Sequence, residues 1–162
     1  MQPTVRGSHS PLVLGRDYNQ ECSIARTLEL LGERWTLLVI RDVFEGRRRF
    51  DQIQGSLGVA RNVLASRLAR LVDEGILEKR PYGSHPHRHE YFLTEKGLDL
   101  WPVLIAMLDW GDRHLAGADG PPTLITHKRC GGRVDGRGFC ERCGKRLDAR
   151  DAAASPPARI AA

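Results

Sequence analysis

The chain has 162 residues, a formal net charge of +5 and a pI near 9.3. A chain of this length can bury one good core and a small appendage, and its charge fits a polyanionic partner without proving one. It contains no apolar run of the roughly 20 residues that a membrane-spanning helix needs, and residues 1–19 lack the basic and apolar segments of a secretory signal. We therefore expect a cytoplasmic protein without a membrane segment.

Residues 1–19 are expected to form a flexible tail, because Pro and Gly are scattered among polar residues. The apolar spacing after this tail predicts a helix that begins near Ser23, a candidate N-cap, and continues to Gly32. A second helix is predicted from about Glu33 to Phe44. Its apolar residues are too numerous for one stripe, so we expect it to be buried nearly all round as the central helix of the domain.

Residues 49–77 are predicted to form two helices joined by a tight turn at Gly58, the layout of a helix-turn-helix. The second of these helices has an apolar stripe and an outer side that is small and polar. Such a side can enter the major groove of DNA, where Arg and Asn side chains read base edges. A solvated helix face is the alternative, because helical pairs of this kind also occur in proteins that touch no DNA.

A hairpin is predicted directly after these helices, with strands at residues 76–82 and 89–93 and a polar turn between them. A recognition-type helix followed by a hairpin is a winged helix, and cationic side chains gather at the predicted wing. Histidines at its tip are also compatible with no role. The candidate DNA-binding residues on the helix and the wing are Arg61, Asn62, Ala65, Ser66, Arg70, Arg80, His87 and Arg88.

After the wing, Thr94 is a candidate cap for a helix that starts at Glu95, and Pro102 is expected to restart or kink it. Residues 101–115 carry apolar side chains on two faces, one with Leu115 and one with Trp110. One face can pack on the domain, and a second copy of the chain covers the other most simply. A symmetric dimer would place two recognition helices about 34 Å apart, matching a palindromic operator. A single broad core helix is the alternative.

The C-terminal region begins after a Gly- and Pro-rich boundary at residues 116–122. Residues 123–148 contain two pairs of candidate metal ligands. In each pair two other residues separate the ligands, and a glycine follows the second ligand, a pattern that suits tetrahedral zinc. The four candidate metal ligands are His127, Cys130, Cys140 and Cys143. Four protein ligands would fill all four coordination positions of a zinc ion, which favours a structural rather than a catalytic zinc. Thiol redox chemistry and an unliganded tail are the alternatives. Residues 149–162, rich in Ala, Ser, Pro and Arg, are expected to be disordered.

Several short motifs occur in a fixed order along the chain. They are Cys22 ahead of LLGERWT at 30–36, RFDQI at 49–53, NVLASRL at 62–68, EGIL at 74–77, YFLTEKG at 91–97 and WG at 110–111. Together they resemble the motifs of the HxlR family, winged helix-turn-helix regulators related to the MarR type. The resemblance covers about residues 22–115, and it implies a dimeric DNA-binding transcription factor without catalytic activity. One departure is Ala60, where such helices often begin with a capping Ser or Thr.

Cys22 stands at the start of the first predicted helix, where the helix dipole favours a thiolate. Some members of the family that this chain resembles use a cysteine at this position to sense oxidants or electrophiles. Redox sensing at Cys22 is therefore one hypothesis. A small buried apolar group is the alternative, and the neighbouring Glu21 would disfavour a thiolate.

The sequence as a whole predicts an α+β, mainly α fold: a winged helix-turn-helix with a C-terminal dimerisation helix over residues 20–117 and a zinc-ribbon-like tail. The predicted function is a sequence-specific transcriptional regulator that binds double-stranded DNA as a homodimer and responds to an oxidant or small-molecule effector. The alternative is a metal-stabilised protein-interaction adaptor. A thiol oxidoreductase using Cys140 and Cys143 has little support, because no strand-helix-strand context surrounds them, and no enzymatic motif is evident.

Overall fold

The structure is a computed structural model that describes residues 18–83, 88–118 and 120–155. Most of the expected flexible tail, the wing tip with His87 and the last seven residues lie outside the described residues. The chain divides between Arg34 and Trp35 into two compact units, and each is described by itself. Among the described residues, no helix is both long and apolar enough to cross a membrane.

The first unit contains α1 (Ser23–Leu31). The predicted N-cap is displaced by one residue: Cys22 is the N-cap, with extended backbone, and Ser23 is the first helical residue. The carbonyl of Ser23 accepts a hydrogen bond from Thr27 Oγ1 at 2.8 Å within the helix. Ile24 and Leu28 are exposed on this helix, whereas Leu31 is buried.

The second unit begins with α2 (Thr36–Phe44), which starts three residues later than predicted. The helix cannot include Trp35, because this residue has a φ of 79° in the left-handed region. The expectation that this helix is buried nearly all round agrees with the structure, in which only Leu38 among its residues is exposed, at 39%. The helix contacts α3, α4 and β2, and its last residue, Phe44, packs against Trp101.

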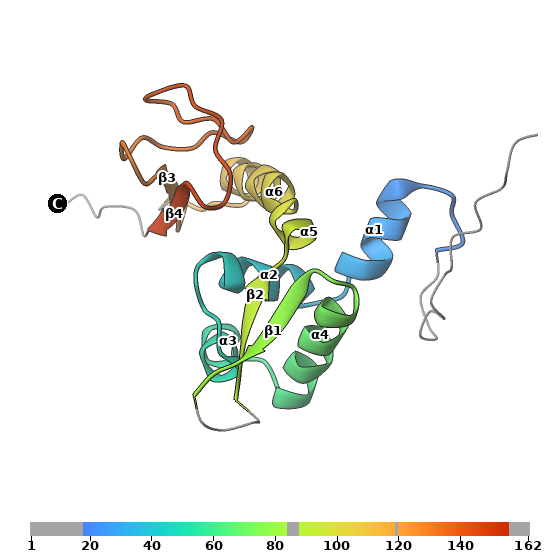
Figure 1. Ribbon diagram of the computed structural model, residues 1–162. Helices are drawn as coiled ribbons and strands as arrows, with labels where there is room; N and C mark the ends of the chain where they lie inside the picture. The colour runs from blue at the N-terminus through green and yellow to red at the C-terminus, as the bar shows by residue number, and fades with distance from the viewer. Residues whose placement is uncertain (1–17, 84–87, 119, 156–162) are drawn as a thin grey trace, which may run out of the picture. The chain divides into compact units, whose positions relative to one another are not determined.

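The helix-turn-helix consists of α3 (Phe50–Leu57) and α4 (Arg61–Asp73). Gly58 makes the turn between them with a φ of 63°, and its N–H donates to the carbonyl of Gln54 at 2.9 Å. The wing follows as β1 (Leu77–Pro81) and β2 (His89–Leu93), which pair antiparallel (Figure 1). The predicted helix-turn-helix and its wing are therefore confirmed.

The core of the winged helix is apolar and comes from α2, α3, α4 and β1. Burying one such aliphatic side chain contributes about 1.5–3 kcal/mol relative to leaving it in water. In the stripe predicted on α4, Leu64, Leu68 and Leu71 are buried and Val72 is half-buried, which fixes the side of this helix that faces outward. The most deeply buried apolar side chains are Val39, Ile40, Ile53, Leu64, Leu68, Leu71, Ile76 and Leu77.

The helices after the wing are α5 (Glu95–Leu98) and α6 (Trp101–His114). Thr94 caps α5 as predicted, because its Oγ1 accepts from the Gly97 N–H at 3.1 Å. Pro102 lies in the first turn of α6, so the helix restarts there. Leu115 was expected on a packing face, but it follows the last helical residue and is 73% exposed.

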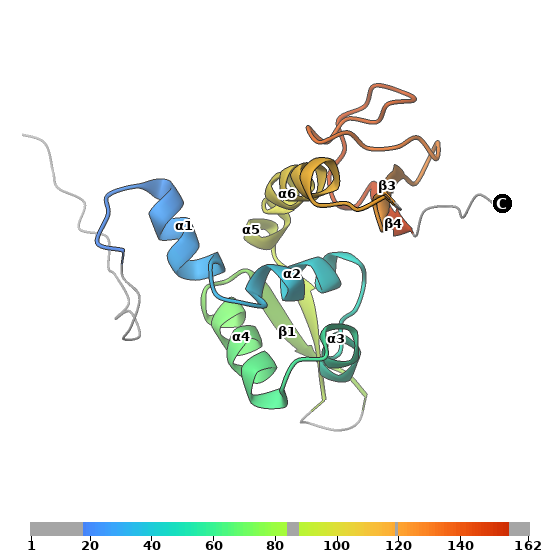
Figure 2. The ribbon, with the colours of Figure 1, turned by 180° about the vertical axis from the view of Figure 1, so that it is seen from behind.

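The C-terminal ribbon, residues 123–155, begins with β3 (Leu124–His127) and ends with β4 (Ala152–Ser155), which pair antiparallel. The prediction of disorder from residue 149 is therefore wrong up to residue 155. Backbone pairing with β3 and burial of Ala152 outweigh the low strand propensity of alanine. The β3–β4 sheet lies beside α6 in both views (Figures 1 and 2).

Candidate nucleic-acid interface and metal centre

The outer face of α4 carries the side chains that were predicted to enter a major groove. Arg61, Asn62, Ala65 and Ser66 are all exposed on it, and Arg70 is half-buried near the helix end. Ala60 is the N-cap and makes no side-chain capping bond, as its lack of a hydroxyl implies. The small residues leave the helix backbone accessible, which close approach to base edges requires.

Arg61 is held against the preceding helix α3. Its guanidinium donates to Gln54 Oε1 at 3.2 Å and lies 4.8 Å from the centroid of the Phe50 ring. A guanidinium that is stacked and bonded in this way loses less rotamer freedom when it meets a phosphate or a base. The structure therefore orients this cation before any partner arrives.

The wing carries Arg80 on β1 and Arg88 just before β2, and both are exposed. Arg80 bonds to Glu78 and lies 4.5 Å from the centroid of the Phe92 ring. The carbonyl of Arg88 accepts a hydrogen bond from the Tyr82 N–H at 3.0 Å, which holds the two strand ends together. The third wing candidate, His87, lies outside the described residues.

Two further cations belong to this surface and were not predicted as site residues. Arg48 lies 4.3 Å from the centroid of the Phe92 ring, and Arg49 lies 4.5 Å from that of Tyr82 while pairing with Glu90 at 3.0 Å. The run of three arginines before α3 was the available signal, but only the hairpin register places it against the wing.

A cavity of about 630 Å³ opens between the start of α3, the start of α4 and the wing. Its lining combines cationic and aromatic side chains, which are the groups that bind nucleic-acid phosphates and bases. The lining residues are Arg49, Phe50, Asp51, Arg61, Tyr82, Arg88, His89 and Tyr91.

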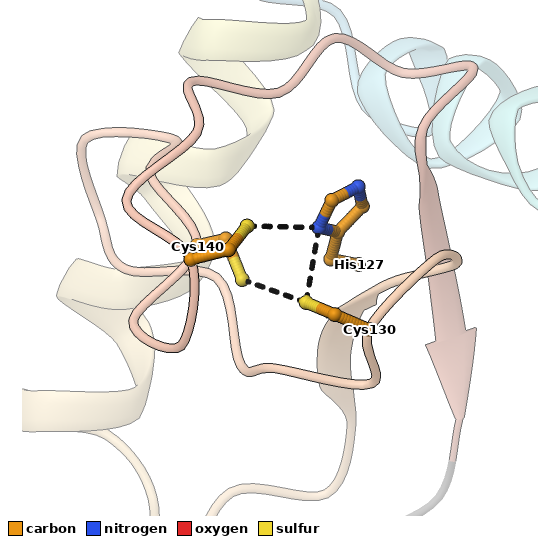
Figure 3. A group of neighbouring side chains, drawn as sticks. His127, Cys130 and Cys140 are labelled. Atoms are coloured by element: carbon orange, nitrogen blue, oxygen red, sulfur yellow. Dashed lines mark hydrogen bonds between the residues drawn. The ribbon is translucent and has the colours of Figure 1, made fainter.

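The candidate metal centre brings together the four predicted ligands. The Nδ1 of His127 lies 3.2 Å from the Cys130 sulfur and 3.4 Å from the Cys143 sulfur. The Cys130 and Cys140 sulfurs lie 3.4 Å apart (Figure 3). All four ligand atoms lie within 4.8 Å of one another. A tetrahedral zinc with bonds of about 2.0–2.3 Å would separate its ligands by about 3.5–3.8 Å. The residues therefore fit a zinc ion.

The two ligand pairs lie on turns of the same conformation. Gly131 has a φ of 69° and donates its N–H to the carbonyl of His127 at 2.8 Å. Gly144 has the same φ of 69° and donates to the carbonyl of Cys140 at 2.8 Å. Left-handed backbone of this kind favours glycine. The two glycines thus turn the chain behind each pair and direct its ligands to one point.

The protonation of the cluster also suits a cation. Burial raises the pKa of Cys140, but hydrogen bonds from the backbone N–H groups of Cys143 and Arg142 outweigh it and lower the pKa to about 6. The Gly132 N–H lowers the pKa of Cys130, but burial and the neighbouring thiols leave it raised. Cys140 is thus a thiolate near neutral pH, which is the form that binds zinc.

The ring orientation of His127 adds a second argument for a ligand. Its side chain is buried, and Nδ1 faces the sulfurs while the buried Nε2 has no hydrogen-bond partner among the described residues. A buried polar group without a partner is unfavourable unless another interaction holds it in place. Coordination through Nδ1 would supply that interaction.

Cys22, the predicted redox residue, belongs to the first unit and is exposed. Its sulfur makes no capping hydrogen bond of ordinary geometry. The Ala25 and Ile24 N–H groups in the first turn of α1 nevertheless lower the pKa of this thiol. The alternative, a buried apolar cysteine, does not match its exposure among the described residues.

The fold and the cationic surface define a winged helix-turn-helix protein of the DNA-binding class. The profile of the HxlR-like helix-turn-helix family matches residues 30–119. The chain belongs to this family, and it is a transcriptional regulator with a helix-turn-helix fold. Regulators of this kind bind DNA, and they are generally not enzymes.

Three known proteins illustrate the relationship. The HTH-type transcriptional regulator Rv3095 of Mycobacterium tuberculosis is 46% identical over 134 residues, which cover 83% of this chain and 85% of that protein. The structure of PA1607, a proposed transcription factor, is 35% identical with a TM-score of 0.67, and the match covers 82% of this chain and 93% of PA1607. The reduced regulator YodB from Bacillus subtilis is 32% identical with a TM-score of 0.50, covering 59% and 96%.

The match to Rv3095 is longer than the family profile, which ends at residue 119. Even a match that began at Met1 would need to reach residue 134 to span 134 residues of this chain. The similarity to that relative therefore includes the first ligand pair of the ribbon.

Proposed function

We propose that the chain is a sequence-specific transcriptional regulator that binds a palindromic operator as a homodimer in the cytoplasm, and that it acts by binding rather than by catalysis. The observation that carries the proposal is the exposed outer face of α4, which is small, polar and flanked by cations within a winged helix. In this proposal Asn62 and Ser66 read base edges, whereas Arg61 and Arg70 position the helix in the major groove. Arg80, Arg88 and His87 hold flanking phosphates from the wing.

The dimer is supported by the apolar side chains that the described residues leave uncovered on α6. Val103, Met107 and Trp110 are 42%, 51% and 53% exposed. They recur at positions that share one side of the helix. An uncovered apolar face of this kind marks an association surface, and a second copy of the same chain is the simplest cover.

The first experiment titrates the full chain onto DNA from upstream of its own gene at two salt concentrations. Arg70→Ala should weaken binding and reduce the salt dependence, because one phosphate contact is lost. Asn62→Ala should also relax base preference by about 1–3 kcal/mol at one position. Arg137→Ala is the matched control, since it removes the same charge from an exposed position of the ribbon.

The outcome separates the regulator from the adaptor alternative. Binding that is specific and falls steeply with salt supports the regulator, because phosphate contacts release counterions. If Arg70→Ala and Asn62→Ala bind the operator as the unchanged chain does, the assignment of α4 is wrong. Salt-insensitive capture of a protein partner, without DNA binding, would favour the adaptor.

We further propose that Cys22 makes the regulator responsive to oxidants or electrophiles. Its exposure and its lowered pKa support this role, because the thiolate is the reactive form. YodB, a relative that has been solved with a bound quinone, points to the same class of effector. A quinone should release the unchanged protein from DNA but leave Cys22→Ser bound. An unchanged protein that stays on DNA after treatment would overturn this role.

We also propose that the four-ligand cluster holds a structural zinc ion. The fit of the ligand distances and the paired glycine turns support it. Zinc contributes folding free energy directly in small domains of this type. Protein purified without chelator should contain one zinc equivalent per chain by elemental analysis. A folded ribbon that neither carries zinc nor takes it up would overturn this assignment.

A further inference from the structure

We propose that Cys130 and Cys140 form an oxidisable thiol pair, separate from the single thiol Cys22, whose conversion to a disulfide ejects the metal ion and loosens the ribbon on α6. The metal half of this inference rests on the zinc site proposed above. The inference adds a modification site in the ribbon and a route from that site to the helix that carries the association surface.

The choice of pair follows from the positions of the sulfurs. Those of Cys130 and Cys140 lie 3.4 Å apart, so a small movement brings them to the bonding distance of about 2.05 Å. Cys130 is partly exposed and open to a small oxidant, whereas Cys140 is 1% exposed. The Cys140 sulfur lies against Gly132, where an added Cβ would approach it to 2.6 Å. The geometry thus makes Cys130 the sulfur that the oxidant reaches first, whereas the Cys140 sulfur is shielded from it.

The chemistry balances with hydrogen peroxide as the oxidant. The Cys130 thiolate attacks one peroxide oxygen, forming a sulfenic acid and releasing hydroxide, which takes up a proton to become water. The Cys140 thiolate then attacks the Cys130 sulfur and displaces a second hydroxide, which also becomes water. Two thiolates lose one electron each, and the peroxide is reduced to two waters. The metal loses two of its four ligands, since a disulfide no longer offers thiolates.

The strands that carry the metal site are also the strands that dock on α6. The metal ligand His127 is the last residue of β3, and its cross-strand partner in β4 is Ala152. Ala152 packs in one apolar cluster with Trp101 and Ile105 of α6. A ligand and a docking residue therefore occupy the same rung of one two-stranded sheet.

A second side chain links the two sites. Ile125 packs against the ribbon core of Val134, Cys140 and Leu147, and it also packs against the cluster of Trp101 on α6. The ribbon is further tied to α5 by the Arg150–Glu95 ion pair at 2.6 Å. This pair is exposed, so it adds little holding energy by itself. Loss of the metal would therefore weaken the sheet that supplies most of the apolar docking.

The test uses full-length, zinc-loaded Cys22→Ser protein, so that the first thiol cannot contribute. Peroxide should release one zinc equivalent to a chromogenic chelator, and the intact chain should lose two hydrogens in mass. Trypsin places the three ribbon cysteines on separate peptides, because Arg133, Arg137 and Arg142 lie between them. The linked peptides should be residues 130–133 and 138–142. A link that includes residues 143–145 would overturn the pairing.

The structural consequence is read by hydrogen exchange on the same samples. After oxidation, amides of β3, β4 and the first turns of α6 should exchange faster, while those of α4 should not change. Dithiothreitol followed by zinc should restore the original pattern. Zinc release without faster exchange in α6 would overturn the link between the two sites.

These outcomes distinguish the inference from the functions proposed above. A folded protein without zinc overturns the structural-zinc assignment and the ejection step together. A zinc-loaded protein that keeps its metal under peroxide overturns the thiol pair alone. Operator binding by the reduced protein is a separate measurement, and its failure would concern α4 rather than the ribbon.

Discussion

The winged helix buries aliphatic side chains from α2, α3, α4 and β1, whereas the ribbon's own buried cluster consists of Val134, Cys140 and Leu147. One of these three is itself a candidate metal ligand. The ribbon, residues 123–155, is also below the size of about 40 residues at which a domain can usually fold without metal, disulfides or partners. The comparison indicates that the winged helix is stabilised by apolar packing, whereas the ribbon depends on the metal that we propose for its four ligand atoms.

The ribbon nevertheless contributes to the larger part. One side of α6 is covered by Ile125, Ala149 and Ala152, so the ribbon buries Trp101 and Ile105 together with Phe44 of α2. From the sequence, one face of this helix was expected to pack on the domain and the other to be covered by a second copy of the chain. The ribbon in fact covers one face, and the face with Trp110 stays open.

The largest expected effect is the loss of a metal ligand. Cys140→Ser should reduce the zinc content from one equivalent to a small fraction, because binding in comparable peptides is worth about 10–16 kcal/mol and needs every ligand. Amides of the ribbon should lose protection, while the helical unfolding transition of the winged helix should persist. Elemental analysis and circular dichroism measure the two parts. Cys22→Ser is the matched control, since it removes a thiol outside the cluster. Retained zinc would show that Cys140 is not a required ligand, and loss of the helical transition would show that the winged helix depends on the ribbon for its stability.

A substitution that leaves a cavity in the winged-helix core should have the opposite effect, lowering the stability of the winged helix while the zinc content is kept. Leu68 is 1% exposed, and Leu68→Ala should lower the free energy of unfolding by about 2–5 kcal/mol. The zinc content should not change. Leu115→Ala makes the same chemical change at a position that is 73% exposed, so its effect should stay within about 0.5 kcal/mol. Equal effects of the two variants in a denaturant titration would show that Leu68 is not a core residue.

Local signals in the sequence explain why the winged helix was predictable. The Leu64, Leu68 and Leu71 stripe, the Gly58 turn and the Thr94 cap each act within a few residues, so periodicity and capping chemistry locate them. The start of α2 was predicted three residues too early, because it is set by the left-handed backbone of Trp35, with a φ of 79°, and not by a residue pattern. No propensity of tryptophan predicts that conformation.

The metal ligands were predictable for a similar reason, since each pair and its glycine lie close together in the sequence. The arrangement around them was not. Strand β4 consists of three alanines and a serine, and it forms because β3 and α6 lie beside it. In the cavity beside the wing, Arg49 was missed because its place depends on Tyr82 and Glu90, more than thirty residues away. Long-range packing supplied what local patterns could not.

A smaller effect is expected where the ribbon meets α6. A Cβ at Gly136 would lie 2.3 Å from Asp109 Cγ, and this carboxylate is already paired with Arg113 at 2.9 Å. In Gly136→Ala the Asp109 side chain must move away, which should weaken docking by about 1 kcal/mol, the scale of an exposed ion pair. Hydrogen exchange in β3 and α6 should rise at full zinc content. Gly55→Ala, which meets open space in α3, is the control. If both variants exchange alike, the close approach of Gly136 does not contribute to docking.

The smallest expected effect is a gain of stability confined to the winged helix. Ala60 has the extended backbone of an N-cap but no side chain that can accept a hydrogen bond. In Ala60→Ser the hydroxyl can accept from the N–H of Asn62 or Val63, which should add about 0.5–1 kcal/mol and raise the melting temperature by about 2–4 °C. Ala69→Ser is the matched control, because the same hydroxyl in mid-helix finds no unpaired N–H and should lower stability slightly. Zinc release on heating should keep its original midpoint in both variants. A cap that shifts both transitions equally would show that the ribbon and the winged helix unfold as one cooperative unit.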